Sequence, residues 1–173
     1  ICFDCRNNSQ TFAREAAQVM AANSIPVRLF QALRPTPELS FAVREYGCIA
    51  GINITASHNP KEYNGYKVYW SDGAQLPPQH AAAIARELEQ IDIFTGVRRM
   101  EFDDAKAQGL IEIMGAETDE RFMSHVMAMV NDRESMAKVA DTFHMVYTPF
   151  HGCGWKLVPE ALRGLGVKHL HCV

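Results

Sequence analysis

Short apolar runs alternate with amphipathic segments along the first part of the chain. The runs at residues 1–3, 27–30 and 48–55 are typical of buried strands. A short helix is expected between the second and third runs, from residue 36 to about residue 46. A longer helix is expected between the first two runs, because apolar side chains recur there on one helical face: Phe12, Ala16, Val19 and Met20. Strand–helix–strand units with short joints favour an α/β fold with a mixed, mainly parallel sheet and helices on both faces.

Polar residues and glycine indicate where these two helices begin and end. Ser9 is the expected N-cap of the first helix, because a serine hydroxyl can accept a hydrogen bond from an unpaired amide of the first turn. Asn23 suits a left-handed C-cap. Thr36 and Pro37 form an N-cap and N1 pair for the second helix, and Gly47 is expected to end it.

The pattern loosens after a short expected strand at residues 66–70. Pro78 is expected to open a helix whose apolar side chains face inward: Ile84, Leu88 and Ile91. Residues 117–130 read as an amphipathic connector helix, and an incomplete second α/β unit follows it. We therefore expect a first domain at residues 1–115 and a truncated second one at 116–173. Both ends fall within expected strands, which predicts a piece of a longer protein.

Composition excludes several classes of function. The net charge is −3 with no basic cluster, which argues against nucleic-acid binding. No apolar run is long enough to span a bilayer and no signal peptide is recognisable, so a cytoplasmic location is expected. The five cysteines have no paired metal-binding spacing, which indicates reduced thiols.

The polar segment at residues 55–60, Thr-Ala-Ser-His-Asn-Pro, lies where a strand of the expected sheet ends. Ligands of open α/β sheets bind beyond the carboxyl ends of strands. A plain polar turn is one interpretation, since Ser, Asn and Pro are turn formers. A serine hydrolase fits poorly, because the G-x-S-x-G pattern is absent and His58, adjacent in sequence, is badly placed to act as base for Ser57. Phosphoryl transfer fits better: Ser57 would accept the group, and Lys67 lies just past the following turn.

Four ordered segments extend this interpretation. "TASHNP" followed by "NGYK" resembles the phosphoserine loop of the α-D-phosphohexomutases, the phosphoglucomutase/phosphomannomutase superfamily. "FDCRNNS" is similar to a first-domain segment of that family, with Cys5 in place of the usual Ser. "LRPTPELSFAVR" resembles the segment ahead of the active-site strand, and "YTPFHGCGWKLVPEAL" the opening of the second domain. Together they cover nearly the whole chain.

The resemblance implies specific roles. Ser57 would cycle between hydroxyl and phosphoserine, His58 would contact the phosphate or sugar hydroxyls, and Lys67 would be the general acid/base. Asn59 and Asn64 would shape the loop and contribute to substrate binding. The whole enzyme would interconvert α-D-glucose 1-phosphate, or mannose 1-phosphate, and the 6-phosphate through a bisphosphate intermediate, with hexose 1,6-bisphosphate as activator. Its partners would be the phosphosugar and the rest of the same polypeptide, domains II–IV.

The resemblance also implies Mg²⁺. A phosphate oxygen on Ser57 would be one ligand, and three aspartates of a D-G-D-G-D-R loop, which this sequence lacks, would be the others. Asp103 and Asp104 are expected to begin a helix rather than to bind metal. The 173-residue chain alone is therefore expected to be inactive.

Two alternatives stay open. One is a phosphopentomutase of the same superfamily. The other is a non-catalytic interaction or regulatory domain that retains the loop, for which an exposed Trp70 or Trp155 would mark a partner surface; both tryptophans are expected in the core. Gly152-Cys153-Gly154 does not complete G-x-G-x-x-G, because position 157 is Leu, so no dinucleotide site is expected there.

Overall fold

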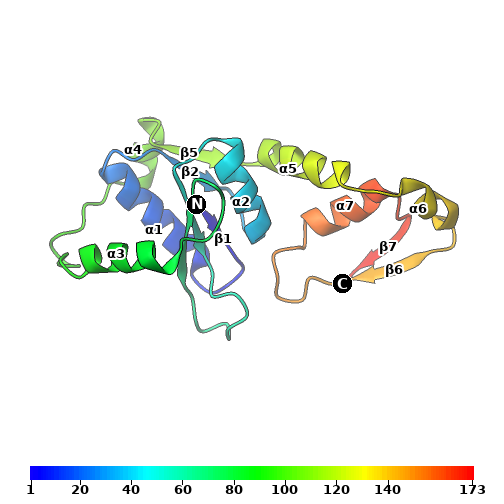
Figure 1. The fold of residues 1–173 in the computed structure, drawn as a ribbon, viewed down its shortest axis with the longest axis horizontal. Coiled ribbons are helices and arrows are strands. Elements are labelled where there is room, and N and C mark those ends of the chain that lie inside the picture. The colour runs from blue at the N-terminus through cyan, green and yellow to red at the C-terminus, as the bar shows by residue number, and fades with distance from the viewer. The chain divides into compact units, whose positions relative to one another are not determined.

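The structure, a computed structural model, describes residues 1–173. The chain divides into two compact units, Ile1–Met114 and Gly115–Val173 (Figure 1). None of the helices combines the length and the apolar composition needed to cross a membrane. No disulfide joins any of the five cysteines.

The first unit is built on five strands: β1 (Cys2–Phe3), β2 (Val27–Phe30), β3 (Ala50–Ile54), β4 (Tyr66–Trp70) and β5 (Ile111–Met114). β1 pairs with β3 and β2 pairs with β5, both in parallel, whereas β3 and β4 are antiparallel. The backbone N–H of Phe30 donates to the carbonyl of Ile1 at 3.0 Å and so joins β2 to the start of β1. The three-stranded sheet β1–β3–β4 and the pair β2–β5 thus adjoin where β2 meets β1, and the predicted mixed, mainly parallel α/β architecture is confirmed.

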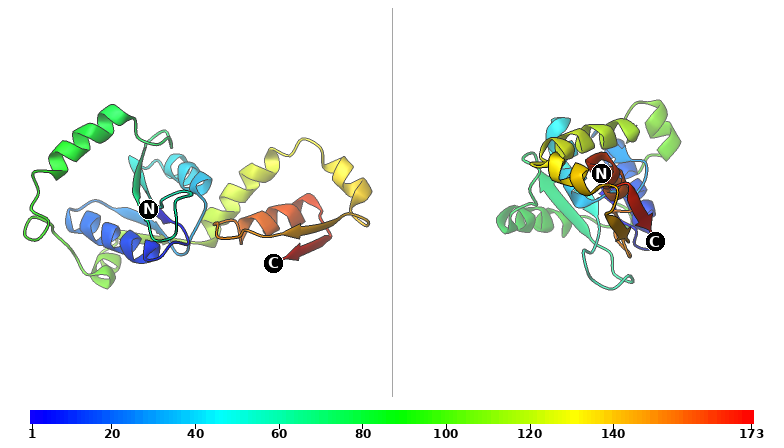
Figure 2. Two further views of the ribbon diagram at one scale, coloured as in Figure 1. Left: turned by 90° about the horizontal axis from the view of Figure 1, so that it is seen from below. Right: turned by 90° about the vertical axis from the view of Figure 1, so that its right-hand side faces the viewer.

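Helices cover both faces of these strands. The unit's helices are α1 (Ser9–Ala22), α2 (Thr36–Glu45), α3 (Pro78–Leu88) and α4 (Phe102–Ala107). Phe3 packs in a core cluster with α1 and α4, and its neighbour Cys2 packs in a second cluster with α2. Successive side chains of a strand point to opposite faces, so the two clusters lie on opposite sides of the sheet. Figure 2 shows α1 and α2 on different sides of the strands.

The buried face of α1 differs from the predicted one. Ala13, Ala17 and Ala21 are 0–1% exposed and line the core, whereas Phe12 is 46% exposed. These alanines recur every four residues, so they form a flat stripe that lets the helix backbone approach the sheet closely. Periodicity identified the helix, but it favoured the larger apolar side chains over the small ones that are buried.

The N-cap expected for α1 is wrong, whereas Asn23 is its C-cap as predicted but not in the left-handed conformation. Ser9 lies inside the helix, and its hydroxyl donates to Asp4 Oδ1 at 2.8 Å rather than capping an amide. Asn8, with a φ of 64°, precedes it. At the other end Asn23 has a φ of −99°, and the left-handed residue is Ser24.

The start of α2 is displaced by one residue from the expected position. Pro35 is the N-cap and Thr36 is already helical. The Thr36 hydroxyl accepts a hydrogen bond from Asn53 Nδ2 at 2.8 Å, so it is used to tie the helix to β3. Gly47, with a φ of 59°, follows the helix end as predicted.

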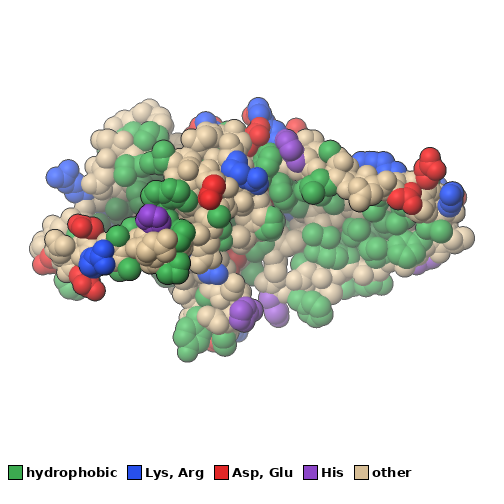
Figure 3. Space-filling view, viewed as in Figure 1, with side chains coloured by type: hydrophobic (Ala, Val, Ile, Leu, Met, Phe, Trp, Pro, Cys, Tyr) green, Lys and Arg blue, Asp and Glu red, His purple; other side chains and the backbone are tan.

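The apolar residues expected to face inward from α3 are exposed. No residue of α3 is buried, and Ile84, Leu88 and Ile91 are 39%, 61% and 45% exposed. Apolar side chains reach the surface over this helix, at the lower left of the space-filling view (Figure 3). Trp70 and Trp155 are about half exposed as well, contrary to the expectation that both belong to the core.

The second unit has its own parallel strand pair. Its elements are α5 (Ala116–Ala128), α6 (Arg133–Val139), β6 (His144–Tyr147), α7 (Leu157–Leu165) and β7 (His169–Cys172). β6 and β7 pair in parallel, and Gly166, with a φ of 110°, ends α7 as predicted. An ion pair between Asp119 of α5 and Lys156, just ahead of α7, links the two helices.

Candidate active site

The predicted serine lies in a loop at the carboxyl end of β3. Residues 55–65, hereafter the Ser57 loop, connect this strand to β4. Ser57 is exposed and has a φ of 58°, in the left-handed region that non-glycine residues seldom occupy. Its backbone N–H donates to Thr55 Oγ1 at 3.1 Å. Non-glycine residues in this conformation persist where the surroundings enforce it, and they concentrate at functional sites.

Lys67 reaches the serine from the neighbouring strand. It lies in β4 opposite Asn53 of β3, and its Nζ donates to Ser57 Oγ at 3.2 Å. The structure thus brings together the two residues that the sequence proposed as nucleophile and acid/base. An ammonium group at this distance can stabilise negative charge on the serine oxygen and can exchange a proton with it.

A buried carboxylate anchors the start of the loop. Asp4, directly after β1, accepts hydrogen bonds from Thr55 Oγ1 at 2.6 Å, from Ser9 Oγ at 2.8 Å and from the Arg6 backbone N–H at 2.9 Å. Its side chain is only 13% exposed. Because both carboxylate oxygens are engaged, Asp4 serves the loop's architecture, and sequence reasoning assigned it no role.

Arg6 grips the loop from the same side. Its guanidinium donates to four backbone carbonyls of the loop, those of Ser57, Asn59, Pro60 and Tyr63, at 2.6–3.1 Å. This contact spans more than fifty positions of sequence. The only sequence signal was the position of Arg6 in "FDCR", at the end of the strand that pairs with β3.

Asn64 closes the other end of the loop. Its amide nitrogen donates to Ser9 Oγ at 2.8 Å and to the Asn7 carbonyl at 3.2 Å, while its Oδ1 accepts from the Gly65 N–H at 2.8 Å. A Cβ on Gly65 would lie 2.7 Å from the Thr55 carbonyl oxygen, so the two loop ends meet too closely for any side chain there.

His58 and Asn59 lie beside Ser57 on the exposed part of the loop. The Asn59 backbone N–H donates to the Ala56 carbonyl at 3.1 Å, and its own carbonyl accepts from Arg6. The side chains of these two residues are therefore presented on the loop surface, where an incoming ligand can meet them.

The residues of this chain do not make a metal site. No group of three or more His, Cys, Asp or Glu side chains is placed to hold an ion. Asp103 and Asp104 lie in the first turn of α4, as predicted. Within the loop, oxygens of Ser57 and Glu62 are exposed, but they fall well short of the octahedral set that Mg²⁺ requires.

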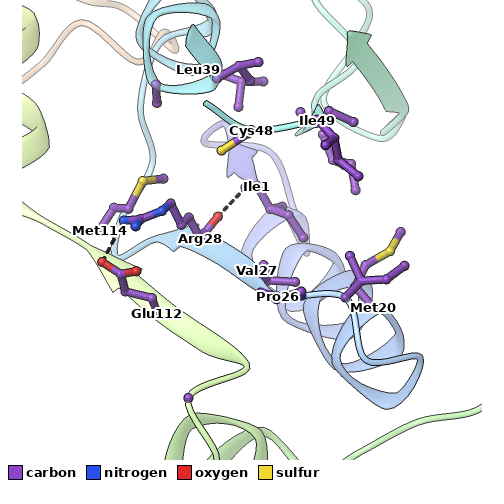
Figure 4. Close-up of a pocket in the computed structure, with 17 residues that line it drawn as sticks. Ile1, Met20, Pro26, Val27, Arg28, Leu39, Cys48, Ile49, Glu112 and Met114 are labelled. Atoms are coloured by element: carbon purple, nitrogen blue, oxygen red, sulfur yellow. Dashed lines mark hydrogen bonds and ion pairs between the residues drawn. The ribbon is translucent and has the colours of Figure 1, made fainter. Parts of the chain in front are cut away.

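An apolar cavity of about 420 Å³ lies away from the Ser57 loop. It is lined around the amino-terminal ends of β2 and β3, by Pro26, Val27, Ala50 and Gly51 among others (Figure 4). The Arg28–Glu112 ion pair, at 2.7 Å, stands at its border. Ligands of parallel sheets bind at the opposite, carboxyl ends of strands, where Ser57 lies.

Comparison with known proteins agrees with this placement. Residues 1–93 match the family model "Phosphoglucomutase/phosphomannomutase, alpha/beta/alpha domain I", which is more than half of the chain. The phosphoglucomutase of Staphylococcus aureus (strain MRSA252) is 36% identical over 177 aligned residues, covering 99% of this chain. The phosphoglucomutase of Staphylococcus saprophyticus is 35% identical over 163 residues, covering 94%. The chain spans about 30% of the length of these relatives.

Two solved structures share the fold. A protein from Thermus thermophilus assigned as a phosphomannomutase superposes with a TM-score of 0.77 at 24% identity, over 99% of this chain and 36% of its own. The Paramecium phosphoglucomutase parafusin, in its open form, gives a TM-score of 0.73 at 19% identity, over 98% and 35%. At these identities the likeness concerns the fold alone.

Proposed function

Because the chain belongs to the phosphoglucomutase/phosphomannomutase family, we propose that its parent protein is a phosphohexomutase that uses Ser57 as the phosphoryl carrier. The observation that carries this proposal is the 3.2 Å contact between Lys67 Nζ and Ser57 Oγ at the carboxyl end of β3. A merely structural turn has no need of a lysine directed at an exposed, left-handed serine.

The proposed reaction transfers one phosphoryl group out and one back. In the first transfer the bond between phosphorus and Ser57 Oγ breaks, and a bond to a sugar hydroxyl oxygen forms. Overall, one proton passes from the sugar hydroxyl to the serine oxygen. Lys67 is placed to donate that proton to Ser57 Oγ and to take it back on the return transfer. Positioned proton transfer of this kind contributes about 10²–10⁴-fold to rate.

The neighbouring residues would bind and orient. His58 and Asn59 are exposed beside Ser57 and offer donors to phosphate or sugar oxygens. Asn64 uses both of its amide atoms within the protein, so its part is to hold the loop in shape. Mg²⁺ would need ligands from outside these 173 residues.

The proposed substrate is α-D-glucose 1-phosphate, with mannose 1-phosphate as the alternative hexose, and hexose 1,6-bisphosphate as activator. The names of the Staphylococcus relatives support glucose. The whole reaction is proposed for the full-length protein. The 173-residue chain alone is expected to show no turnover, since it presents the serine loop without a metal site.

A coupled assay tests the proposal. Full-length protein with Mg²⁺ and glucose 1,6-bisphosphate should convert glucose 1-phosphate to glucose 6-phosphate, and Ser57→Ala should abolish the conversion. Ser71→Ala, at another exposed serine of the first unit, is the matched control and should retain it. Equal activity in the two variants would exclude Ser57 as the carrier. A full-length protein without turnover on any phosphosugar would favour the non-catalytic alternative.

A further inference from the structure

We propose that Arg6 is a positioning residue: it holds the Ser57 loop in the one conformation that places Ser57 Oγ against Lys67 Nζ. The inference deepens the proposed function and rests on it for its catalytic consequence. Its structural consequence, a loop that is ordered by one side chain, stands independently.

The Arg6 guanidinium grips the loop at two places. One terminal nitrogen donates to the carbonyls of Ser57 and Asn59, each at 2.6 Å. The other donates to the carbonyls of Pro60 at 2.7 Å and Tyr63 at 3.1 Å. The first pair brackets His58 and the second ends the turn, so a single planar group sets the path of the loop from the serine onward.

These contacts engage both terminal nitrogens of the guanidinium. Arginine has five N–H groups in a fixed fork. Four are accounted for by the loop carbonyls. The fifth, on Nε, is buried and makes no hydrogen bond, and Nε lies 3.2 Å from Asp4 Oδ2 in an ion pair. The side chain is also only 9% exposed. The terminal nitrogens of Arg6 are therefore taken up by the loop and its remaining N–H is buried beside Asp4, so Arg6 acts on the reaction through the loop.

Removing the guanidinium would leave several carbonyl dipoles converging on an empty space. Such an arrangement is unfavourable, because buried or clustered acceptors without donors lose their hydrogen bonds and repel one another. The left-handed conformation of Ser57 is itself costly for a non-glycine residue. Both effects favour relaxation of the loop, and the Ser57–Lys67 contact is the one that relaxation would break.

Lysine cannot replace this arginine. Its ammonium carries three donors at one point, whereas the carbonyls of the loop lie around a planar fork. Arg6→Lys keeps the positive charge near the loop and loses the geometry. Comparison of Arg6→Ala with Arg6→Lys thus separates the effect of the guanidinium's geometry from the effect of its positive charge.

The structural test measures loop mobility in full-length protein. Hydrogen exchange followed by mass spectrometry should show faster exchange in peptides covering residues 57–65 of both Arg6 variants, with the rest of the first unit protected as in wild type.

Trypsin should cleave after Lys61, an exposed loop residue, about tenfold faster or more, since cleavage follows the population of the open loop. Arg98→Ala, at another exposed arginine of the first unit, is the control and should change neither result. If Arg6→Ala does not fold, Arg6→Lys alone decides. Unchanged exchange and cleavage overturn the proposal.

The catalytic test is run on the same variants. Displacement of a reacting group by about 1 Å costs about 10²-fold in rate. Both Arg6 variants should therefore lose about that factor in kcat, with KM within a few-fold of wild type. Millimolar guanidinium ion should restore part of the kcat of Arg6→Ala and none of that of Lys67→Met. A mobile loop with unchanged kcat overturns the positioning role. If wild-type protein has no mutase activity, the proposed function fails, while the exchange data still decide whether Arg6 orders the loop.

Discussion

Lys67 Nζ donates to Ser57 Oγ at 3.2 Å, across ten positions of sequence and one antiparallel strand pairing. The lysine is directly opposite Asn53, whose side chain is buried and bonded to Thr36 of α2. The strand that pairs with the lysine's strand is therefore anchored to the core.

Replacing Lys67 with Met should lower turnover of the full-length protein by about 10²-fold or more, because Met keeps the stem and loses both the charge and the proton. Lys61→Met removes an exposed lysine of the same loop and should leave the rate within about twofold, a margin well below the factor that positioned proton transfer supplies. Steady-state kinetics on the two variants decide the matter. Comparable rates for both would mean that Lys67 is not the acid/base.

Ser57 should be the residue that is stably phosphorylated after the full-length protein is treated with glucose 1,6-bisphosphate. A phosphate adds about −1.5 to −2 charges at neutral pH, and Lys67, whose Nζ lies 3.2 Å from Ser57 Oγ, is placed to offset them. Intact mass and peptide mapping measure the modification. Phosphate on another residue, with Ser57 unmodified, would contradict the assignment.

Thr55→Val should reduce the free energy of unfolding of the first unit by about 1–3 kcal/mol. The Thr55 hydroxyl donates to Asp4 at 2.6 Å and accepts from the Ser57 N–H at 3.1 Å, and valine keeps the shape but loses both bonds. Thr55→Ser retains the hydroxyl and should keep most of the stability. Urea unfolding of both variants is the measurement, and a valine variant as stable as the serine variant would show that these bonds contribute little.

Two glycine-to-alanine substitutions should change the stability of the protein in opposite directions. At Gly65 a Cβ would lie 2.7 Å from the Thr55 carbonyl oxygen, a backbone atom that cannot turn aside, so Gly65→Ala should destabilise the protein and disturb the loop. At Gly164, inside α7, the nearest atoms are in the flexible Met127 side chain at 3.4–3.7 Å. Gly164→Ala should stabilise its helix by about 0.5–1 kcal/mol, the usual difference between alanine and glycine. Thermal unfolding of each variant reports the sign.

Sequence patterns predicted the sheet architecture because its signals are local. Strand runs, turn residues and Gly47 and Gly166 as helix ends all depend on neighbours in the chain. The Ser57–Lys67 contact could be predicted for the same reason, since both residues belong to one hairpin. Signals that are local in the sequence were thus sufficient to predict the central contact of the site.

The parts that sequence reasoning missed depend on contacts between distant segments. Arg6 and Asp4 act on the Ser57 loop only because β1 pairs in parallel with β3, which brings the ends of two strands together. The prediction that the apolar side of α3 faces inward was wrong for a related reason. Periodicity shows that Ile84 and Leu88 share a side of a helix, but it cannot show whether another segment covers that side.

The short sequence separation within the β3–β4 hairpin also determines how the contact between Ser57 and Lys67 can be lost. Closing a loop of this length costs little chain entropy, and loops of about ten residues close in roughly 10–100 ns. The tip of the hairpin can therefore open and reclose while the parallel strands behind it stay folded, as a local excursion well below the free energy of global unfolding. Warming to a temperature below the global unfolding transition should therefore separate Ser57 from Lys67 and inactivate the serine while the sheet stays folded. Cooling should restore the contact without a delay for refolding.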